Sequence, residues 1–266
     1  MAPTMDSNRG RTRTYRANGL VLKKSPLGES DLIVTFYTPD GGKISAVAKG
    51  ARRSTSKLVG HLEPLTLTKL SLSRGRNLDI ITQAQIVNGF ASLKSDLTAV
   101  TKGLYTIELV DGFGSEDHPN QSLYGLTLDI LSAISQNPQS DLILRFFELH
   151  LLSASGLMPE LYKCVECRKT LEPSEHRFSA DGGGTICTDC TPSDVLLRPL
   201  SLRALKVLRF LARASLSDLP ALYLDDALHQ EIKSVLGTSV EYWLGKEIRS
   251  NSFLEHLQHP SSEGVY

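Results

Sequence analysis

Four cysteines have the residue type and spacing that predict the most specific chemistry in this sequence. Cys164 and Cys167 form one CxxC pair, Cys187 and Cys190 form a second, and nineteen residues separate the two pairs. A CxxC turn places two sulfurs on the same side of an ion, and zinc prefers four soft ligands in a tetrahedron. We therefore predict one structural Zn²⁺ ion bound by four thiolates, with no open coordination position for water or substrate.

The same segment leaves two alternatives open. The cysteines could form two disulfides, although the sequence shows no signal peptide and a reducing compartment keeps thiols free to bind metal. His176, which lies between the pairs, could replace one sulfur ligand. Gly182, Gly183 and Gly184 precede the second pair, and we expect them to let the backbone turn and approach closely, as small zinc modules need.

The net charge of zero hides a strong asymmetry along the chain. Residues 1–82 contain fourteen Lys and Arg against six Asp and Glu, whereas the remainder contains fifteen against twenty-three. This division indicates that one domain meets a polyanion while the other does different work. The alternative is that basic side chains merely solvate a small domain.

The densest group of cations lies at residues 49–57, between two predicted strands. Arg pairs with phosphate through two parallel hydrogen bonds, and Lys supplies a point charge. Aromatic residues that could stack on bases are few (Tyr15, Phe36 and Tyr37), so we expect contacts to the phosphate backbone rather than base-specific recognition. The predicted DNA-binding residues, in this loop and at other strand ends, are Lys23, Lys24, Lys43, Lys49, Arg52, Arg53, Lys57, Arg74 and Arg76.

A predicted helix over residues 200–214 carries a stripe of basic residues beside its apolar stripe. Such a stripe is a candidate secondary surface for DNA or a protein partner, and it is also typical of the solvated face of a bundle helix. The residues concerned are Arg203, Lys206, Arg209 and Arg213.

No enzyme signature accompanies these groups. The sequence lacks a GxxxxGK[ST] phosphate loop, a GxSxG elbow and an HExxH helix. We therefore expect no catalytic residues and no enzymatic activity. Two other classes stay open: a protein–protein adaptor with incidental DNA contact, and a metal-dependent hydrolase, which would need an open zinc position.

These groups must be positioned by two kinds of structure. Residues 14–88 alternate apolar and polar side chains between turn sequences, which predicts five short strands at about 19–22, 31–38, 43–48, 62–72 and 78–87. A sheet of this size closes into a barrel to remove its edges, and the five-stranded OB-fold is the expected form.

The spacing changes to three or four residues beyond residue 89, which predicts an α-helical domain over 89–257. Helices are expected from about residue 93 and over 122–136, 139–155, 200–214 and 225–248, with the zinc module inserted at about 159–192. The fold class is thus α+β, and residues 1–13 and 258–266 are predicted to be disordered tails. No segment is apolar enough to predict a membrane span.

Several segments together resemble the RecO family of bacterial DNA repair and recombination mediators. They are residues 15–22, 26–31, 38–43, 48–53 and 62–64, then 156–161 before the first CxxC pair, and 249–254 near the end. The resemblance implies an N-terminal OB-fold, a helical domain, and a zinc module that only some members retain. Because this sequence has all four cysteines, zinc is expected here.

The resemblance also implies a function. Members of the family bind single- and double-stranded DNA, anneal complementary strands, and associate with RecR and with the C-terminal tail of the single-strand-binding protein SSB. With RecR they help to load RecA onto SSB-coated DNA. A cytoplasmic, nucleoid-associated location is therefore expected. The Arg-rich segment 1–13 has no counterpart in the resemblance.

Overall fold

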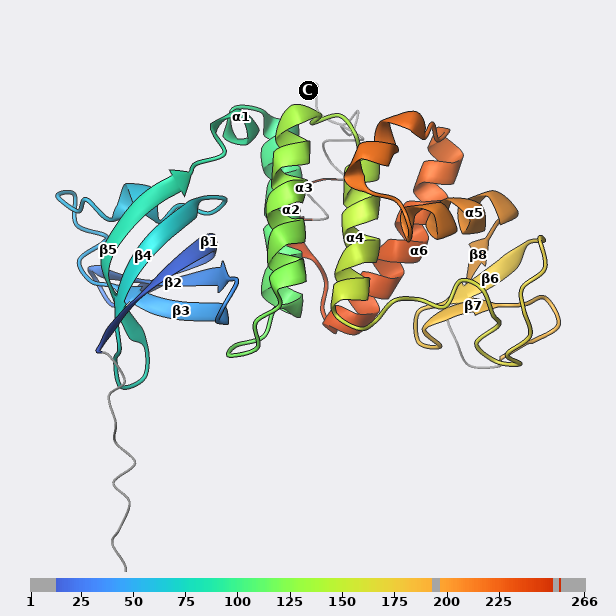
Figure 1. Cartoon of the computed structure of the whole chain (residues 1–266), viewed down its shortest axis with the longest axis horizontal. Coiled ribbons are helices and arrows are strands. Elements are labelled where there is room, and N and C mark those ends of the chain that lie inside the picture. The colour runs from blue at the N-terminus through green and yellow to red at the C-terminus, as the bar shows by residue number, and fades with distance from the viewer. Residues whose placement is uncertain (1–12, 193–196, 251–253, 255–266) are drawn as a thin grey trace, which may run out of the picture. The chain divides into compact units, whose positions relative to one another are not determined.

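A computed structural model of the chain describes residues 13–192, 197–250 and 254 (Figure 1). The predicted tails at 1–13 and 258–266 lie outside these residues, apart from Arg13. The chain divides into two compact units, one running up to Gly89 and including Gly114–Pro119, the other containing Phe90–Phe113 and the chain from Asn120 onward. The prediction had assigned residues 114–119 to the helical domain.

The first unit is a closed five-stranded barrel with the strand order β1-β2-β3-β5-β4. This arrangement confirms the predicted OB-like fold and the α+β class. Only β3 and β5 pair in parallel, through Ala46 with Asp79 and Val47 with Ile80. The strands are β1 (Thr14–Leu27), β2 (Asp31–Thr38), β3 (Gly42–Ala48), β4 (Leu67–Ser73) and β5 (Asp79–Asn88).

The barrel closes because β1 serves two neighbours. Its first half pairs with β4 and its second half with β2, and the register shifts between Val21 and Lys23. Such a bulge bends a strand and increases its twist, which a small barrel requires. The strand predicted at about 19–22 is therefore longer than expected, since β1 runs from Thr14 to Leu27 and ends at the turn that contains Gly28.

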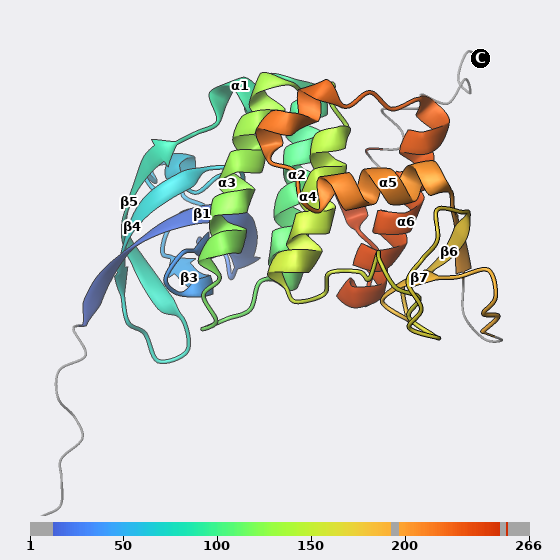
Figure 2. The ribbon, with the colours of Figure 1, turned by 45° about the vertical axis from the view of Figure 1, so that its right-hand side comes forward.

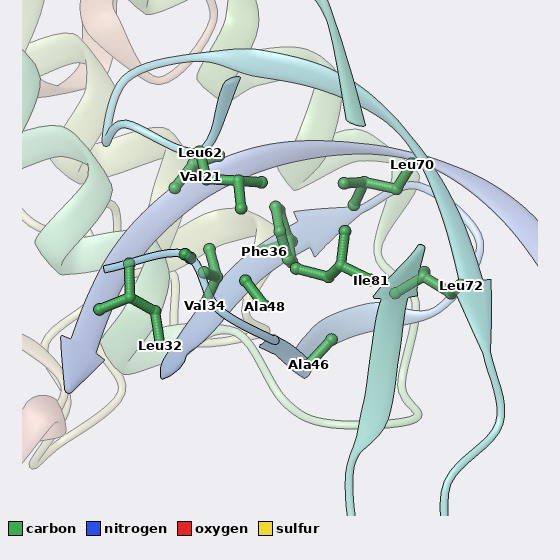
Figure 3. Packing of buried hydrophobic residues seen from close by; sticks show 11 residues of the cluster. Val21, Leu32, Val34, Phe36, Ala46, Ala48, Leu62, Leu70, Leu72 and Ile81 are labelled. Carbon is green, nitrogen blue, oxygen red and sulfur yellow. The ribbon is translucent and has the colours of Figure 1, made fainter. Parts of the chain in front are cut away.

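Every second side chain of each strand points into the barrel, and these side chains form its core. Val34 and Phe36 on β2, together with Leu70 on β4, are almost fully buried and point toward one another (Figure 3). The strand predicted at residues 62–72 begins only at Leu67, because Leu65 adopts a left-handed φ of 58° that interrupts an extended strand. A short 3-10 turn, η1 (Val59–His61), occupies part of the connection.

Residues 114–119 pack on the barrel edge at the start of β3. The amide of Lys43 donates to the carbonyl oxygen of Ser115 at 3.0 Å. A Cβ atom at Gly42, whose φ is 63°, would lie 2.6 Å from the carbonyl oxygens of Ser115 and His118. Only glycine allows this close approach at that backbone angle.

The second unit is built on helices that lie side by side, with α3 contacting both α2 and α4, and α4 contacting α6. Figure 2 shows α5 running crosswise to α3 and α4. No helix in the described part of the chain is long and apolar enough to cross a membrane. The helices are α1 (Ala91–Lys94), α2 (Leu97–Phe113), α3 (Gln121–Gln136), α4 (Leu142–Ala154), α5 (Leu202–Leu211), the 3-10 helix η2 (Leu216–Ala221) and α6 (Asp226–Leu244).

Caps explain where the last helices differ from the prediction. α5 begins two residues late because Ser201 is its N-cap, with Oγ accepting from the amide of Ala204 at 3.1 Å. α6 ends at Leu244 rather than at residue 248, since Gly245 closes it with a φ of 66°.

The metal segment also contains a sheet that the sequence did not predict. β6 (His176–Ser179) pairs antiparallel with β7 (Gly184–Ile186) and with β8 (Leu197–Leu200). The strands are three or four residues long, and Pro199 within β8 argued against a strand there. β6 is the central strand of this sheet, so it fixes where the second CxxC pair emerges.

Candidate metal centre and nucleic-acid interface

The structure brings the four predicted metal ligands together. The sulfurs of Cys164, Cys167, Cys187 and Cys190 all lie within 4.8 Å of one another, and those of Cys167 and Cys187 are 3.8 Å apart. Four sulfurs bound tetrahedrally to zinc at about 2.3 Å would lie about 3.8 Å from one another. The cysteines are free thiols rather than disulfides. The residues therefore fit a four-thiolate metal centre.

Backbone hydrogen bonds shape the first CxxC turn. The amide of Cys164 donates to Lys169 O and the amide of Arg168 donates to Cys164 O, both at 2.9 Å. Arg168 adopts a left-handed φ of 62°, which reverses the chain directly after Cys167. The amide of Cys187 approaches the sulfur of Cys164 at 3.4 Å. The protein's own hydrogen bonds thus hold the two pairs close together without a metal ion.

The thiols of this cluster have shifted pKa values. Burial raises the pKa of Cys164, but hydrogen bonds from the backbone of Cys187, Cys167 and Glu166 outweigh it and lower the pKa to about 6. Hydrogen bonding with the sulfur of Cys187 raises the pKa of Cys190 to about 12. One thiol thus loses its proton readily while its neighbour keeps it. A bound dication would stabilise all four sulfurs as thiolates at this close spacing.

Glycine and arginine fix the second CxxC pair, as the glycine run predicted in part. A Cβ atom at Gly184 would lie 2.6 Å from the carbonyl oxygen of Glu160, so the chain before the first pair runs directly against β7. Arg177 of β6 donates to the carbonyl oxygen of Cys190 at 2.5 Å. Arg177 carries no sequence signal, because its role depends on strand pairing rather than on spacing.

His176 does not join the metal cluster. Its side chain is buried in β6, and Nε2 lies 2.8 Å from the carbonyl oxygen of Glu172. The metal-ligand group in the described residues consists of the four cysteines. The alternative of a histidine ligand was wrong, and the closed Cys₄ arrangement matches a structural site.

The basic loop after β3 is held against the turn between β1 and β2. Gly50 donates its amide to Asp31 Oδ1 at 2.7 Å, and Arg52 donates its amide to Ser30 O at 2.9 Å. The hydrogen bond from Gly50, then that from Ser30 and the charges of Lys49 and Arg53, outweigh desolvation and lower the pKa of Asp31.

The cationic ends of this loop stay in solvent. Lys49, Arg52 and Arg53 are all exposed, although Arg52 also donates from Nη1 to Gly28 O at 3.0 Å. Their positions are therefore fixed by backbone contacts while their charges face outward, as a phosphate-binding surface requires.

The other predicted DNA-binding residues are separated around the barrel. Lys24, next to Lys23 on β1, pairs with Glu63 at 2.6 Å. Lys43 and Arg74 line a hollow of about 510 Å³ whose walls also include Asp40, Asp79, Glu116 and Asp117. Arg76 is exposed in the β4–β5 loop, and Lys57 lines a different groove. Their contacts with DNA stay predictions, and the cations differ in how close they lie to carboxylates.

Arg74 is further engaged by an aromatic side chain. Its guanidinium lies 4.9 Å from the ring centroid of Tyr15, whose hydroxyl donates to Asp79 at 2.5 Å. Burial and this hydrogen bond raise the pKa of Tyr15. Phe36 and Tyr37, the other aromatic candidates, are 0% and 1% exposed. Neither can stack on a base in this structure.

The predicted secondary surface on α5 is largely occupied by internal contacts. Arg203 pairs with Asp225 at 2.7 Å, and Arg213 donates from Nε to Arg209 O at 3.1 Å. Arg209 donates to Leu161 O at 2.8 Å, and its guanidinium lies 4.8 Å from the ring centroid of Tyr162.

Lys206, the fourth residue of the stripe, is exposed. Arg209 thus connects α5 to the start of the metal segment, which favours a structural role for most of the stripe.

Comparisons with known proteins place both units in one family. The models described as Recombination protein O N terminal and Recombination protein O C terminal match residues 12–90 and 94–252. A protein of Roseiflexus sp. (strain RS-1), named DNA repair protein RecO, is 38% identical over 248 residues, covering 93% of this chain and 87% of its own length. A protein of the same name from Desulforamulus reducens is 34% identical over 245 residues, covering 92% and 95%.

Proposed function

This chain belongs to the RecO family of DNA repair proteins, and from that premise we propose that it is a DNA-binding recombination mediator. It binds single- and double-stranded DNA and anneals complementary strands during the repair of double-strand breaks and gaps. It acts with RecR and with the C-terminal tail of SSB to help load RecA. These finer activities follow the family resemblance. The location that suits them is the cytoplasm, in association with the nucleoid.

The observation that carries this proposal is the fixed basic loop of the barrel. Annealing needs two polyanions to be held together while their bases stay free to pair. Lys49, Arg52 and Arg53 present charge to solvent from a loop whose backbone is hydrogen-bonded to the β1–β2 turn. Such a surface neutralises phosphates without contacting the bases. Phe36 and Tyr37 are buried and cannot stack on bases, which also favours contacts to the DNA backbone.

The metal centre has a supporting role in this proposal. Four thiolates would complete the coordination of one zinc ion, so the ion supplies cross-linking rather than chemistry. Arg209 on α5 donates a hydrogen bond to the carbonyl oxygen of Leu161, three residues before the metal ligand Cys164. Through this hydrogen bond the ion stabilises the helical unit. We propose that the protein works without catalytic residues.

The direct test is a strand-annealing assay with fluorescent complementary oligonucleotides, with and without SSB, together with a mobility shift at low and moderate salt. We expect the protein to bind oligonucleotides, to lose affinity steeply as salt rises, and to accelerate annealing. A protein that neither shifts an oligonucleotide at low salt nor accelerates annealing would overturn the proposal and leave the adaptor function in its place.

A further inference from the structure

A groove of about 600 Å³ crosses the barrel wall formed by β1, β4 and β5. The floor of the groove consists of outward side chains, which strand pairing places opposite one another in rows across the three strands. Arg16, Ser71 and Gln83 form one row. Lys69 and Gln85 belong to the next row, whose β1 residue, Asn18, lines the neighbouring hollow instead. The connection that contains η1 adds Lys57, Leu58 and His61 to the groove.

The charge of this groove has one sign. Arg16, Lys57 and Lys69 line it and are exposed, and no Asp or Glu is among its lining residues, all of which lie in the described barrel. Arg16 and Lys69 occupy diagonal positions on β1 and β4, which places such residues about 7–8 Å apart. Arg16 also lines the neighbouring hollow around Lys43 and Arg74, which differs from the groove because four carboxylates share it.

The opposite wall of the barrel is less accessible. In OB-folds the face of strands 2 and 3 commonly binds oligonucleotides. Here the outward positions on β2 include Thr35 and Tyr37, which are 5% and 1% exposed. Thr35 Oγ1 also lies 3.2 Å from Ser45 Oγ on β3. Thr35 and Tyr37 are therefore not free to contact bases.

We propose that the groove across β1, β4 and β5 is the track for single-stranded DNA, an inference that rests on the proposed function. Arg16, Lys57 and Lys69 contact successive phosphates, and the amides of Gln83 and Gln85 donate to phosphate or sugar oxygens. No Phe, Tyr or Trp lines the groove, and the imidazole of His61 is its single aromatic ring, so most bases are not stacked on the protein and remain available for a complementary strand. A concave basic track suits one strand better than a rigid duplex.

Of these three cations, only Lys57 is among the DNA-binding residues predicted from the sequence. Arg16 and Lys69 lie inside strands, 53 residues apart in the sequence, where alternation predicts only that they face outward. Their proximity follows from the pairing of β1 with β4.

The test measures the affinity of the full-length protein for a fluorescent oligothymidylate at several salt concentrations. Two double variants are compared, Arg16→Ala/Lys69→Ala in the groove and Lys94→Ala/Lys246→Ala on exposed positions of the helical unit, which removes the same charge. The groove variant is expected to bind at least about tenfold more weakly and to flatten the log–log salt slope by about 1.4, since each single-strand phosphate contact contributes about 0.7.

A second variant separates charge from folding. Gln85 is exposed, so Gln85→Glu adds one repulsive charge to the groove without disturbing the core, and it should weaken binding while leaving the melting temperature unchanged. If wild-type protein binds and both groove variants match the control, the groove inference is wrong and the proposed function stands. If wild-type protein does not bind DNA at all, both fail together.

Discussion

Arg177 Nη2 donates to the carbonyl oxygen of Cys190 at 2.5 Å, and it lies 3.4 Å from the carbonyl oxygens of Cys187 and Thr188. One guanidinium on β6 therefore holds the whole turn that contains the second pair of metal ligands. The strand pairing of β6 with β7 and β8 fixes the position of that guanidinium.

Arg177→Ala should weaken metal binding because the second CxxC turn would lose its support. Groups that orient metal ligands typically change affinity by about 10–100-fold, and we expect the lower end here. Competition with a chromophoric zinc chelator measures the change. Arg177→Lys, which keeps the charge but loses the planar fork, should give an intermediate value. Equal zinc affinity in wild type and Arg177→Ala would show that the turn holds itself.

Cys187→Ser should remove the ion and destabilise the helical unit. A zinc centre that is preformed only in the folded chain contributes its binding energy to folding, so we expect the melting temperature to fall by several degrees or more. X-ray absorption on wild-type protein should find four sulfur ligands. Full zinc occupancy and an unchanged melting temperature in the variant would contradict the structural role.

Gly184→Ala tests the close approach between β7 and the chain before the first cysteine pair. The added methyl would lie 2.6 Å from the carbonyl oxygen of Glu160, and overpacking of this kind costs about 1–3 kcal/mol. Gly237→Ala in α6 is the matched control, since no atom outside the adjoining helix backbone lies within 4 Å of its added Cβ, and alanine favours a helix by about 0.5–1 kcal/mol. Denaturant titrations should show a loss for the first variant only.

The N-cap of α6 predicts a specific pH dependence. The amide of Leu228, and then Arg203, lower the pKa of Asp225 below its usual value. Because the folded pKa is the lower one, this contribution is complete above the unfolded pKa of about 3.9 and is lost as pH falls through the folded pKa.

Asp225→Asn keeps a cap without the charge. Wild type should therefore be the more stable protein at pH 7, and the difference should shrink at pH 2–3. Denaturant midpoints measured across this range give the comparison, in which any loss at the metal centre is common to both proteins. A constant difference would argue against the ionised cap.

Features that depend on residues close together in the chain could be predicted from the sequence. The metal ligands were predictable because a CxxC turn is set by four consecutive residues. Alternation likewise identified β2 and β3, whose pairing needs only the short turn between Thr38 and Gly42. Turns and caps required knowledge of backbone angles, so Leu65 and Gly245 shifted element ends that spacing alone had placed elsewhere.

Features that combine distant segments were beyond the sequence. The partner of Arg177 is thirteen residues away and depends on a sheet of very short strands. Residues 114–119 join the barrel through a backbone hydrogen bond to Lys43, which no side-chain pattern records. The same holds for the groove, where Arg16 and Lys69 come together only through register. Charge asymmetry indicated which part of the chain is basic but could not show which of its cations lie close together.

The central claim is that the basic loop of the barrel binds the DNA backbone, and the salt dependence of binding by Arg52→Ala/Arg53→Ala tests it most directly. Both side chains are exposed, and Arg52 loses one solvent-facing hydrogen bond to Gly28 O, so the variant should fold with little change in melting temperature. Its affinity should fall for oligonucleotides of every sequence, and the log–log salt slope should flatten by about one to two units relative to wild type. An affinity and slope equal to those of wild type would contradict the claim that this loop binds DNA.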